Sequence, residues 1–161
     1  MTVIACDGVS IAADGMACCG QEIVSLSVRK IRVAGNAVYA LAGTAALFDA
    51  LVKWHQSGAD PNEGPKKVSD EMEWGLAVIT AETGRPVLHR FSSKCPYPEY
   101  YPFPFADGVC NQFAIGAMGR GATAEEAVRV ACESSVWAGG DIQVVDIAEA
   151  LGLNPKLAAA E

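Results

Sequence analysis

The order of the expected secondary-structure elements predicts an α+β protein in which two stacked sheets are flanked by helices. The apolar runs near the amino terminus are short and are separated by Asp-Gly and Gly-Asn turns, as in antiparallel strands. A helix, two strands, two helices and a last strand follow, rather than an alternation of single strands and helices. The first apolar runs do not alternate strictly with polar residues, which indicates sheets covered on both faces.

Five short apolar runs in the amino-terminal part of the chain are expected to be strands. They are Thr2–Cys6, Val9–Ala13, Ile23–Val28, Ile31–Val33 and Ala37–Ala42. Asp7-Gly8 supplies the turn of a first hairpin, and Ala34-Gly35-Asn36 supplies the turn between the last two runs. These runs predict five consecutive antiparallel strands.

The first helix is expected to begin at Thr44, which has the side chain of a helix cap, and to end near Ser57-Gly58. Apolar residues recur between these bounds at the spacing of one helical face. A solvated loop, residues 60–67, leads to a second hairpin that pairs Leu76–Thr80 with Val87–Phe91.

The segment Cys95–Phe105 contains four prolines among five aromatic residues, so it cannot form a regular helix or a central strand. We expect an ordered loop whose aromatic side chains cover an edge of the core, and a peptide-docking groove is the alternative.

The carboxyl-terminal part is expected to contain a helix pair and one strand. Asn111–Gly119 is the first helix, and Thr123 with Glu126 predicts a capping box at the start of the second. A last strand spans Ile142–Ile147. Residues 151–161 are expected to be a peripheral tail.

Length and composition narrow the class of protein. With 161 residues, the whole chain (1–161) is expected to be a single domain. The formal net charge of -7 argues against a nucleic-acid partner, because phosphate binding needs clustered Lys and Arg. Small apolar residues are abundant, which predicts additional burial between subunits.

No membrane span, signal peptide, metal or cofactor is expected. The longest apolar stretch, Ala37–Phe48, is far shorter than the roughly 20 residues of a membrane span. The amino terminus does not have the pattern of a signal peptide, so a cytoplasmic location is expected. The six cysteines contain no C-x-x-C pair and the chain has two histidines, so reduced thiols are favoured over disulfides or a zinc site.

Short motifs occur along the chain in a characteristic order. They are Met1-Thr2, an apolar hairpin ending at Asp14-Gly15, Arg29-Lys30-Ile31-Arg32, Leu41–Ala46, Phe113–Met118, Gly121–Ala127 and a strand after Gly139-Gly140. In this order and at these intervals, the motifs resemble the proteasome β-subunit family of N-terminal-nucleophile hydrolases, including the bacterial HslV-type peptidases. The similarity covers most of the chain apart from the proline-rich segment and the tail.

The resemblance implies a four-layer αββα sandwich, homo-oligomeric rings or stacked rings that enclose a chamber, and a threonine protease that hydrolyses unfolded polypeptides. Thr2 becomes the nucleophile after removal of Met1, Asp14 and Lys30 the charged pair beside it, and the Gly43 amide the oxyanion donor. Ala17, Val28, Leu41 and Ala45 match the substrate side-chain pocket, which predicts cleavage after an apolar residue. Whether an ATPase unfoldase is a partner stays open.

Physical chemistry supports these roles. A free α-amino group, with a pKa of about 7.7 to 8.0, can remove the proton of a threonine hydroxyl near neutral pH. A lysine lowers the pKa values of nearby groups, and an aspartate holds the lysine in place. A glycine lets a substrate backbone approach closely. Thr2 follows the initiator Met1 directly, so ordinary methionine removal would expose its amine.

Three positions depart from the family pattern. Val109 stands where a serine hydroxyl is common, and Ser135 and Ala138 stand where an aspartate and a serine precede the paired glycines. Losing these groups weakens support for the nucleophile without removing it. Two alternatives therefore stay open: an inactive or weakly active assembly of the same fold, and an amidase that acts on a small molecule.

Overall fold

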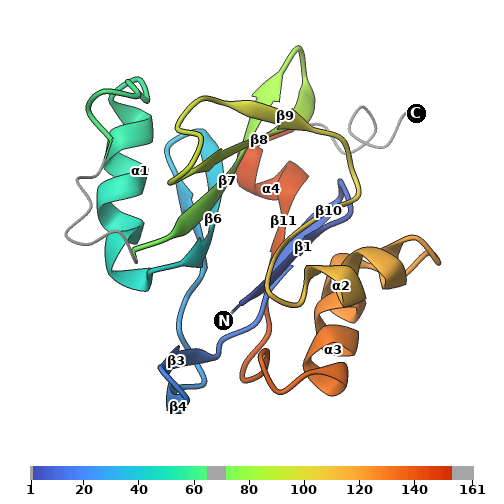
Figure 1. Cartoon of the computed structure of the whole chain (residues 1–161). Coiled ribbons are helices and arrows are strands. Elements are labelled where there is room, and N and C mark those ends of the chain that lie inside the picture. Colours follow the sequence, from blue (N-terminus) through green and yellow to red (C-terminus); the bar gives the residue numbers. More distant parts are fainter. Residues whose placement is uncertain (1, 65–71, 154–161) are drawn as a thin grey trace.

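Antiparallel strands arranged in three sheets, together with four α-helices, make up the part of the chain that the computed structural model describes, residues 2–64 and 72–153. The architecture is therefore α+β (Figure 1). One sheet has four strands in the order β10-β1-β2-β11, namely Phe105–Gly108, Val3–Cys6, Ser10–Ala13 and Gln143–Asp146. A second sheet has five strands in the order β5-β6-β7-β8-β9, namely Ile31–Ala34, Ala37–Gly43, Trp74–Glu82, Arg85–Ser92 and Glu99–Tyr101. The third is the short hairpin of β3 (Ala17–Cys19) and β4 (Glu22–Ser25).

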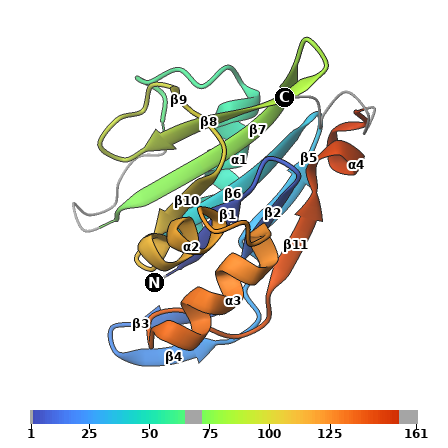
Figure 2. The same ribbon diagram turned by 90° about the vertical axis from the view of Figure 1, so that its right-hand side faces the viewer.

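Helices lie against the outer faces of the two larger sheets. Helix α1 (Phe48–Gln56), preceded by a 3₁₀ turn at Ala45–Leu47, packs on the five-stranded sheet. Helices α2 (Asn111–Met118) and α3 (Ala124–Ser134) pack on the four-stranded sheet, as Figure 2 also shows. A third apolar cluster joins the facing sides of these two sheets and includes Ile147 at the start of α4 (Ile147–Leu151). None of the helices in the described residues is long and apolar enough to cross a membrane.

The central strands of the two larger sheets, β1, β2, β6 and β7, are largely buried on both faces, as the sequence predicts for uninterrupted apolar runs. In β6, Val38 and Ala40 belong to the cluster between the sheets, while Tyr39 and Leu41 belong to the cluster under α1. The side-chain period of two along a strand requires this division. An uninterrupted apolar run is therefore the expected sequence for a strand in this position.

The two predicted hairpins are confirmed, with register pairs Ile4–Ala13 in the first and Leu76–Phe91 in the second. The five strands predicted in the amino-terminal part are present as β1, β2, β4, β5 and β6, and each pairs antiparallel with a strand next to it in the chain. They do not form one continuous sheet, because they are distributed over all three sheets. β1 and β2 belong to the four-stranded sheet, β4 pairs with the unpredicted β3, and β5 joins β6 in the five-stranded sheet. Apolar character identifies a strand but does not choose its partner.

Thr44 does precede the first helical turn, but the prediction that its side chain caps the helix is wrong. Its hydroxyl donates to the carbonyl of Glu73 instead, at 3.3 Å. The Thr44 amide donates to the same carbonyl, at 3.1 Å. Thr44 therefore ties the end of β6 to the start of β7. These strand ends border the pocket described below.

The capping box predicted for α3 is confirmed. The Thr123 hydroxyl accepts from the Glu126 amide at 3.3 Å, and the Glu126 carboxylate accepts from the Thr123 amide at 2.8 Å. The predicted last strand is also present as β11, although Ile147 begins α4, which the sequence analysis missed. Leu151, the first residue of the predicted tail, ends α4 and packs against the core, and the tail from residue 154 onward lies outside the described residues.

The proline-rich segment contains a three-residue edge strand, β9, and ends at the start of β10. An edge position suits such a segment because a proline cannot donate to a central ladder. Phe105 is buried in the core between the sheets and Phe103 packs against the same core, as the favoured interpretation predicts. Tyr97, Tyr100 and Tyr101 are exposed, so only part of the aromatic content covers the core.

Candidate active site

Seven of the eight predicted site residues line one pocket of about 510 Å³. Thr2, Lys30 and Gly43 are among them, and so are the four apolar residues expected to bind a substrate side chain: Ala17, Val28, Leu41 and Ala45. The eighth residue, Asp14, is fully buried and bonds to Lys30 from behind the pocket wall. Residues between positions 2 and 45 thus form one concave site.

The first hairpin brings Thr2 and Asp14 to the same end of the four-stranded sheet. Thr2 immediately precedes β1 and Asp14 immediately follows β2, so the antiparallel register places them close together. The Val3 amide donates to the Asp14 carboxylate at 2.9 Å, and the Asp14 amide donates to the Val3 carbonyl at 3.3 Å. Asp14 is therefore anchored to the residue that follows Thr2.

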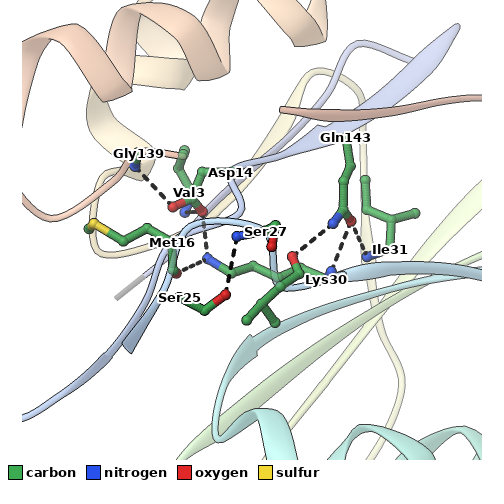
Figure 3. Close-up of polar contacts among 10 residues, drawn as sticks. Val3, Asp14, Met16, Ser25, Ser27, Lys30, Ile31, Gly139 and Gln143 are labelled. Carbon is green, nitrogen blue, oxygen red and sulfur yellow. Dashed lines mark hydrogen bonds and ion pairs between the residues drawn. The ribbon is translucent and has the colours of Figure 1, made fainter. Parts of the chain in front are cut away.

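Lys30 and Asp14 form a buried ion pair, drawn in Figure 3. The Lys30 Nζ donates to Asp14 Oδ1 and to the Met16 carbonyl, both at 2.7 Å. The second Asp14 oxygen accepts from the Gly139 amide at 3.1 Å. The Lys30 side chain is only 7% exposed, so water contributes little to its solvation. A charged pair in such a place needs these additional hydrogen bonds, because desolvating two ions is costly.

Burial lowers the pKa of the Lys30 amine, while the Asp14 carboxylate opposes that shift through its charge and its hydrogen bond. Lys30 consequently releases a proton more readily than a surface lysine does. Such a group can influence proton transfer at a hydroxyl or amine that lies in the same pocket.

Gly43 ends β6 opposite Trp74 and has a φ of +106°, a conformation that favours glycine. A Cβ at this position would lie 2.3 Å from the Glu73 carbonyl oxygen, so no side chain fits. Gly43 is nonetheless exposed toward the pocket. A ligand can therefore approach its backbone closely.

Thr2 is 3% exposed and lies against the end of β10. Gly108, paired with Val3, has a φ of +95°, and a Cβ there would lie 2.2 Å from the Thr2 carbonyl oxygen. Val109, where the family resemblance leads one to expect a hydroxyl, follows directly and is 64% exposed. The strand end that supports Thr2 thus contributes backbone contact and an apolar side chain.

The loop after α3 supports Asp14 through its backbone. Besides its amide bond to Asp14, Gly139 accepts from the amides of Gly15 and Met16 at 3.1 and 2.9 Å. The hydroxyl of Ser135 accepts from the Trp137 amide at 3.1 Å, and Ala138 is buried under α2 and α3. The Ser135 hydroxyl is therefore engaged within its own loop, and the Ala138 side chain is part of the core.

Gln143 is a site-supporting residue that the sequence analysis missed. Its Oε1 accepts from the amides of Lys30 and Ile31 at 2.9 and 3.2 Å, and its Nε2 donates to the Val28 carbonyl at 2.7 Å (Figure 3). One side chain from β11 thereby holds the segment that carries Lys30 and two pocket-lining residues. A polar residue between Ile142 and Val144 was the available sign of such a role.

The described residues also bear on metal and thiol chemistry. Among residues 2–64 and 72–153, no three His, Cys, Asp or Glu side chains are grouped as they would be around a metal ion. Burial, followed by the charge of Asp14, raises the pKa of the Cys132 thiol to about 11, which keeps this thiol protonated at neutral pH. Cys132 is therefore a poor nucleophile at neutral pH, whereas Cys18 lines the pocket together with Thr2.

Comparison with known proteins assigns no family: no protein-family model matches the chain, and a search of the curated proteins found no significant match.

Proposed function

We propose that this chain is a threonine-type endopeptidase of the proteasome β-subunit type, with a four-layer αββα sandwich and Thr2 as its nucleophile after removal of Met1. The observation that carries the proposal is the meeting of Thr2, Lys30 and Gly43 in one pocket, with Asp14 bonded to Lys30 behind them. The two larger sheets, with a common core between them and helices outside, agree with the proposed layers.

In the full chain the Thr2 nitrogen is an amide, and removal of Met1 converts it into an amine. This amine takes the proton of the Thr2 hydroxyl while the oxygen attacks the substrate carbonyl carbon. The C–N bond of the peptide then breaks, and the leaving amine receives that proton. Water attacks the resulting ester in the same way, which releases the acid product and restores Thr2.

Lys30 and Asp14 act on the proton-transfer steps. The positive charge of Lys30 favours the deprotonated forms of the nearby hydroxyl and amine, and Asp14 fixes the position of that charge. Gly43 is proposed to donate its amide to the oxygen that becomes negative in the transition state. Removing one such donor typically costs about 100- to 1000-fold in kcat.

The side chain that precedes the scissile bond is proposed to enter the first pocket. Ala17, Val28, Leu41 and Ala45 contribute apolar surface there, so cleavage after an apolar residue is expected. Several copies are proposed to assemble into a ring that admits only unfolded polypeptide. Exposed apolar side chains on and beside the β3–β4 hairpin, Ile23, Val24 and Leu26, support burial between copies.

The test uses protein released from an amino-terminal fusion that is cleaved immediately before Thr2. We expect an epoxyketone probe to add one equivalent of mass to this protein and a fluorogenic peptide to be hydrolysed. The Thr2→Ala variant, purified in the same way, should show neither reaction, and Thr2→Ser should keep both. Protein that retains Met1 serves as the control and should be inert. An unlabelled, inactive protein that begins at Thr2 would refute the proposal.

A second candidate is a proteolytically inactive or weakly active assembly of the same fold. Val109 favours it, because this apolar, exposed residue follows the Gly108 that contacts the Thr2 backbone. Ser135 and Ala138, which replace an aspartate and a serine of the family pattern, favour it as well. A large particle that is not labelled by the probe would support this alternative. A labelled Thr2 without peptide turnover would instead favour an amidase that acts on a small molecule.

A further inference from the structure

A second pocket, of about 630 Å³, adjoins the candidate active site and shares Gly43 and Glu73 with it. Gly108 also lines this second pocket, and its backbone abuts the Thr2 carbonyl. The two pockets therefore meet at Gly43, and Gly108 connects the second pocket to the Thr2 backbone. A substrate carbonyl placed at Gly43 would have space for chain on both sides of the bond that is cut.

The charged groups of the second pocket are paired with one another. Lys94 Nζ lies 2.8 Å from Glu73 Oε1, and Arg90 lies 3.7 Å from Glu99. Arg90 also donates to Asp107 at 2.7 Å. Each charged residue that lines the pocket thus already has a counter-ion. A charged substrate side chain therefore gains little attraction here, because it would compete with these existing pairs and because ion pairs at exposed positions are weak.

Apolar surface in the same pocket is left uncovered. Val109 is 64% exposed and Tyr101, on the edge strand β9, is 39% exposed. An uncharged side chain that covers them would remove apolar surface from water. The segment Cys95–Phe105 supplies Tyr101 and Glu99, so the proline-rich part of the chain helps to build this pocket.

We infer that the second pocket binds the polypeptide residues that follow the scissile bond and that it selects uncharged, apolar side chains in the first of these positions. The inference rests on the proposed function, because it places the leaving part of a peptide substrate. It also assigns a role to Val109: the valine is a specificity-determining residue on the leaving-group side of the bond. A polypeptide with chain on both sides of Gly43 is then a better substrate than a small amide.

The test compares internally quenched peptides that share the sequence before the scissile bond and differ in the residue after it. Leu, Lys and Asp are compared, using full-length protein that begins at Thr2. We expect kcat/KM for the Leu peptide to exceed that for the Lys and Asp peptides by about tenfold, as is typical of a modest hydrophobic pocket. In Val109→Asp, the ratio of kcat/KM for the Leu peptide to kcat/KM for the Lys peptide (the Leu-to-Lys ratio) should fall about tenfold. Epoxyketone labelling of Thr2 is measured in parallel, because this probe has no leaving group.

The matched control is Val9→Asp. Val9 is 62% exposed, close to the value for Val109, and it lies at the turn between β1 and β2, away from both pockets. For Val9→Asp, the ratio of kcat/KM for the Leu peptide to kcat/KM for the Lys peptide should equal that of the parent protein. Tyr101→Ala should lower kcat/KM for the Leu peptide through KM, whereas Tyr97→Ala, an exposed tyrosine that does not line the pocket, should not.

The outcomes distinguish failure of the inferred second-pocket subsite from failure of the proposed peptidase function. A labelled Thr2 with the same Leu-to-Lys ratio in Val109→Asp overturns the inferred subsite and leaves the peptidase function standing. Protein that is neither labelled nor able to cut any peptide overturns both. A change of particle size in Val109→Asp, with no change in the ratio, would assign the second pocket to contact between copies and also overturns the inference.

Discussion

Replacing Lys30 by methionine tests the buried ion pair most directly. The substitution keeps an unbranched side chain of similar length but removes the ammonium that donates to Asp14 and to the Met16 carbonyl. Asp14 is 0% exposed and would retain the amides of Val3 and Gly139 as donors. Removing one partner of a buried pair typically costs about 3–5 kcal/mol. The two remaining amide bonds favour the lower end of this range, about 3 kcal/mol.

A loss of this size is a large share of the roughly 5–15 kcal/mol that stabilise a typical domain. It corresponds to a fall in Tm of about 10 °C for a chain of this length. Urea unfolding of the parent protein, Lys30→Met, Asp14→Asn and the double variant gives the coupling energy between the two residues. We expect the double variant to be more stable than the sum of the single losses predicts, by more than about 1 kcal/mol.

Lys53→Met is the matched control, because Lys53 is exposed on α1. Its free energy of unfolding should lie within about 0.5 kcal/mol of the parent value. If Lys30→Met costs no more than this control, or if the losses of Lys30→Met and Asp14→Asn simply add, the two groups do not form the coupled pair described here.

Two further predictions concern other contacts. Gln143→Leu removes three hydrogen bonds to the segment that carries Lys30 and should lower kcat at least tenfold. It should also shift the acidic or basic limb of the pH–rate profile, whereas a purely structural role would lower stability and leave that profile in place. His55 bonds to Tyr39 at 3.1 Å, and burial, followed by the charge of His89, lowers its pKa. The charged form is therefore disfavoured in the folded state, so the stability that neutral His55 contributes is complete above its unfolded pKa of about 6.5 and is lost as pH falls through the lower folded value. Urea unfolding at pH 7.5 and pH 5 should show a smaller loss for His55→Gln than for the parent protein, and equal losses would contradict this assignment.

Local patterns predicted the elements that depend on local interactions. The capping box at Thr123 and Glu126 needs only residues three apart, and it is present as expected. The hairpins formed by β1 with β2 and by β7 with β8 likewise follow from short-range turn chemistry and the strands that flank it. Thr44 was mispredicted because its hydroxyl has a competing partner, Glu73, which lies 29 positions away in the chain.

The candidate site likewise contains residues that the sequence singled out and residues that only the structure identified. The order of motifs singled out Thr2, Lys30 and Gly43, and the fold brings them into one pocket. Gln143 could not be chosen in advance, because its three partners lie more than 110 positions away. The same is true of the contribution of Gly139 to Asp14.

The sequence by itself predicted most of the strands and the helices α1, α2 and α3, but not β3, β9, β10 or α4. Through the order of its motifs it also singled out Thr2, Asp14, Lys30 and Gly43 as a set. These are properties of neighbouring residues and of residue order. The tertiary structure alone decided how strands are shared among sheets, and it alone placed Gln143 on the Lys30 segment and Val109 beside a second pocket. The physical reason is that every backbone amide needs a hydrogen-bond partner and every apolar side chain needs a packing partner, but neither specifies which one. The partner is fixed only when distant segments pack together.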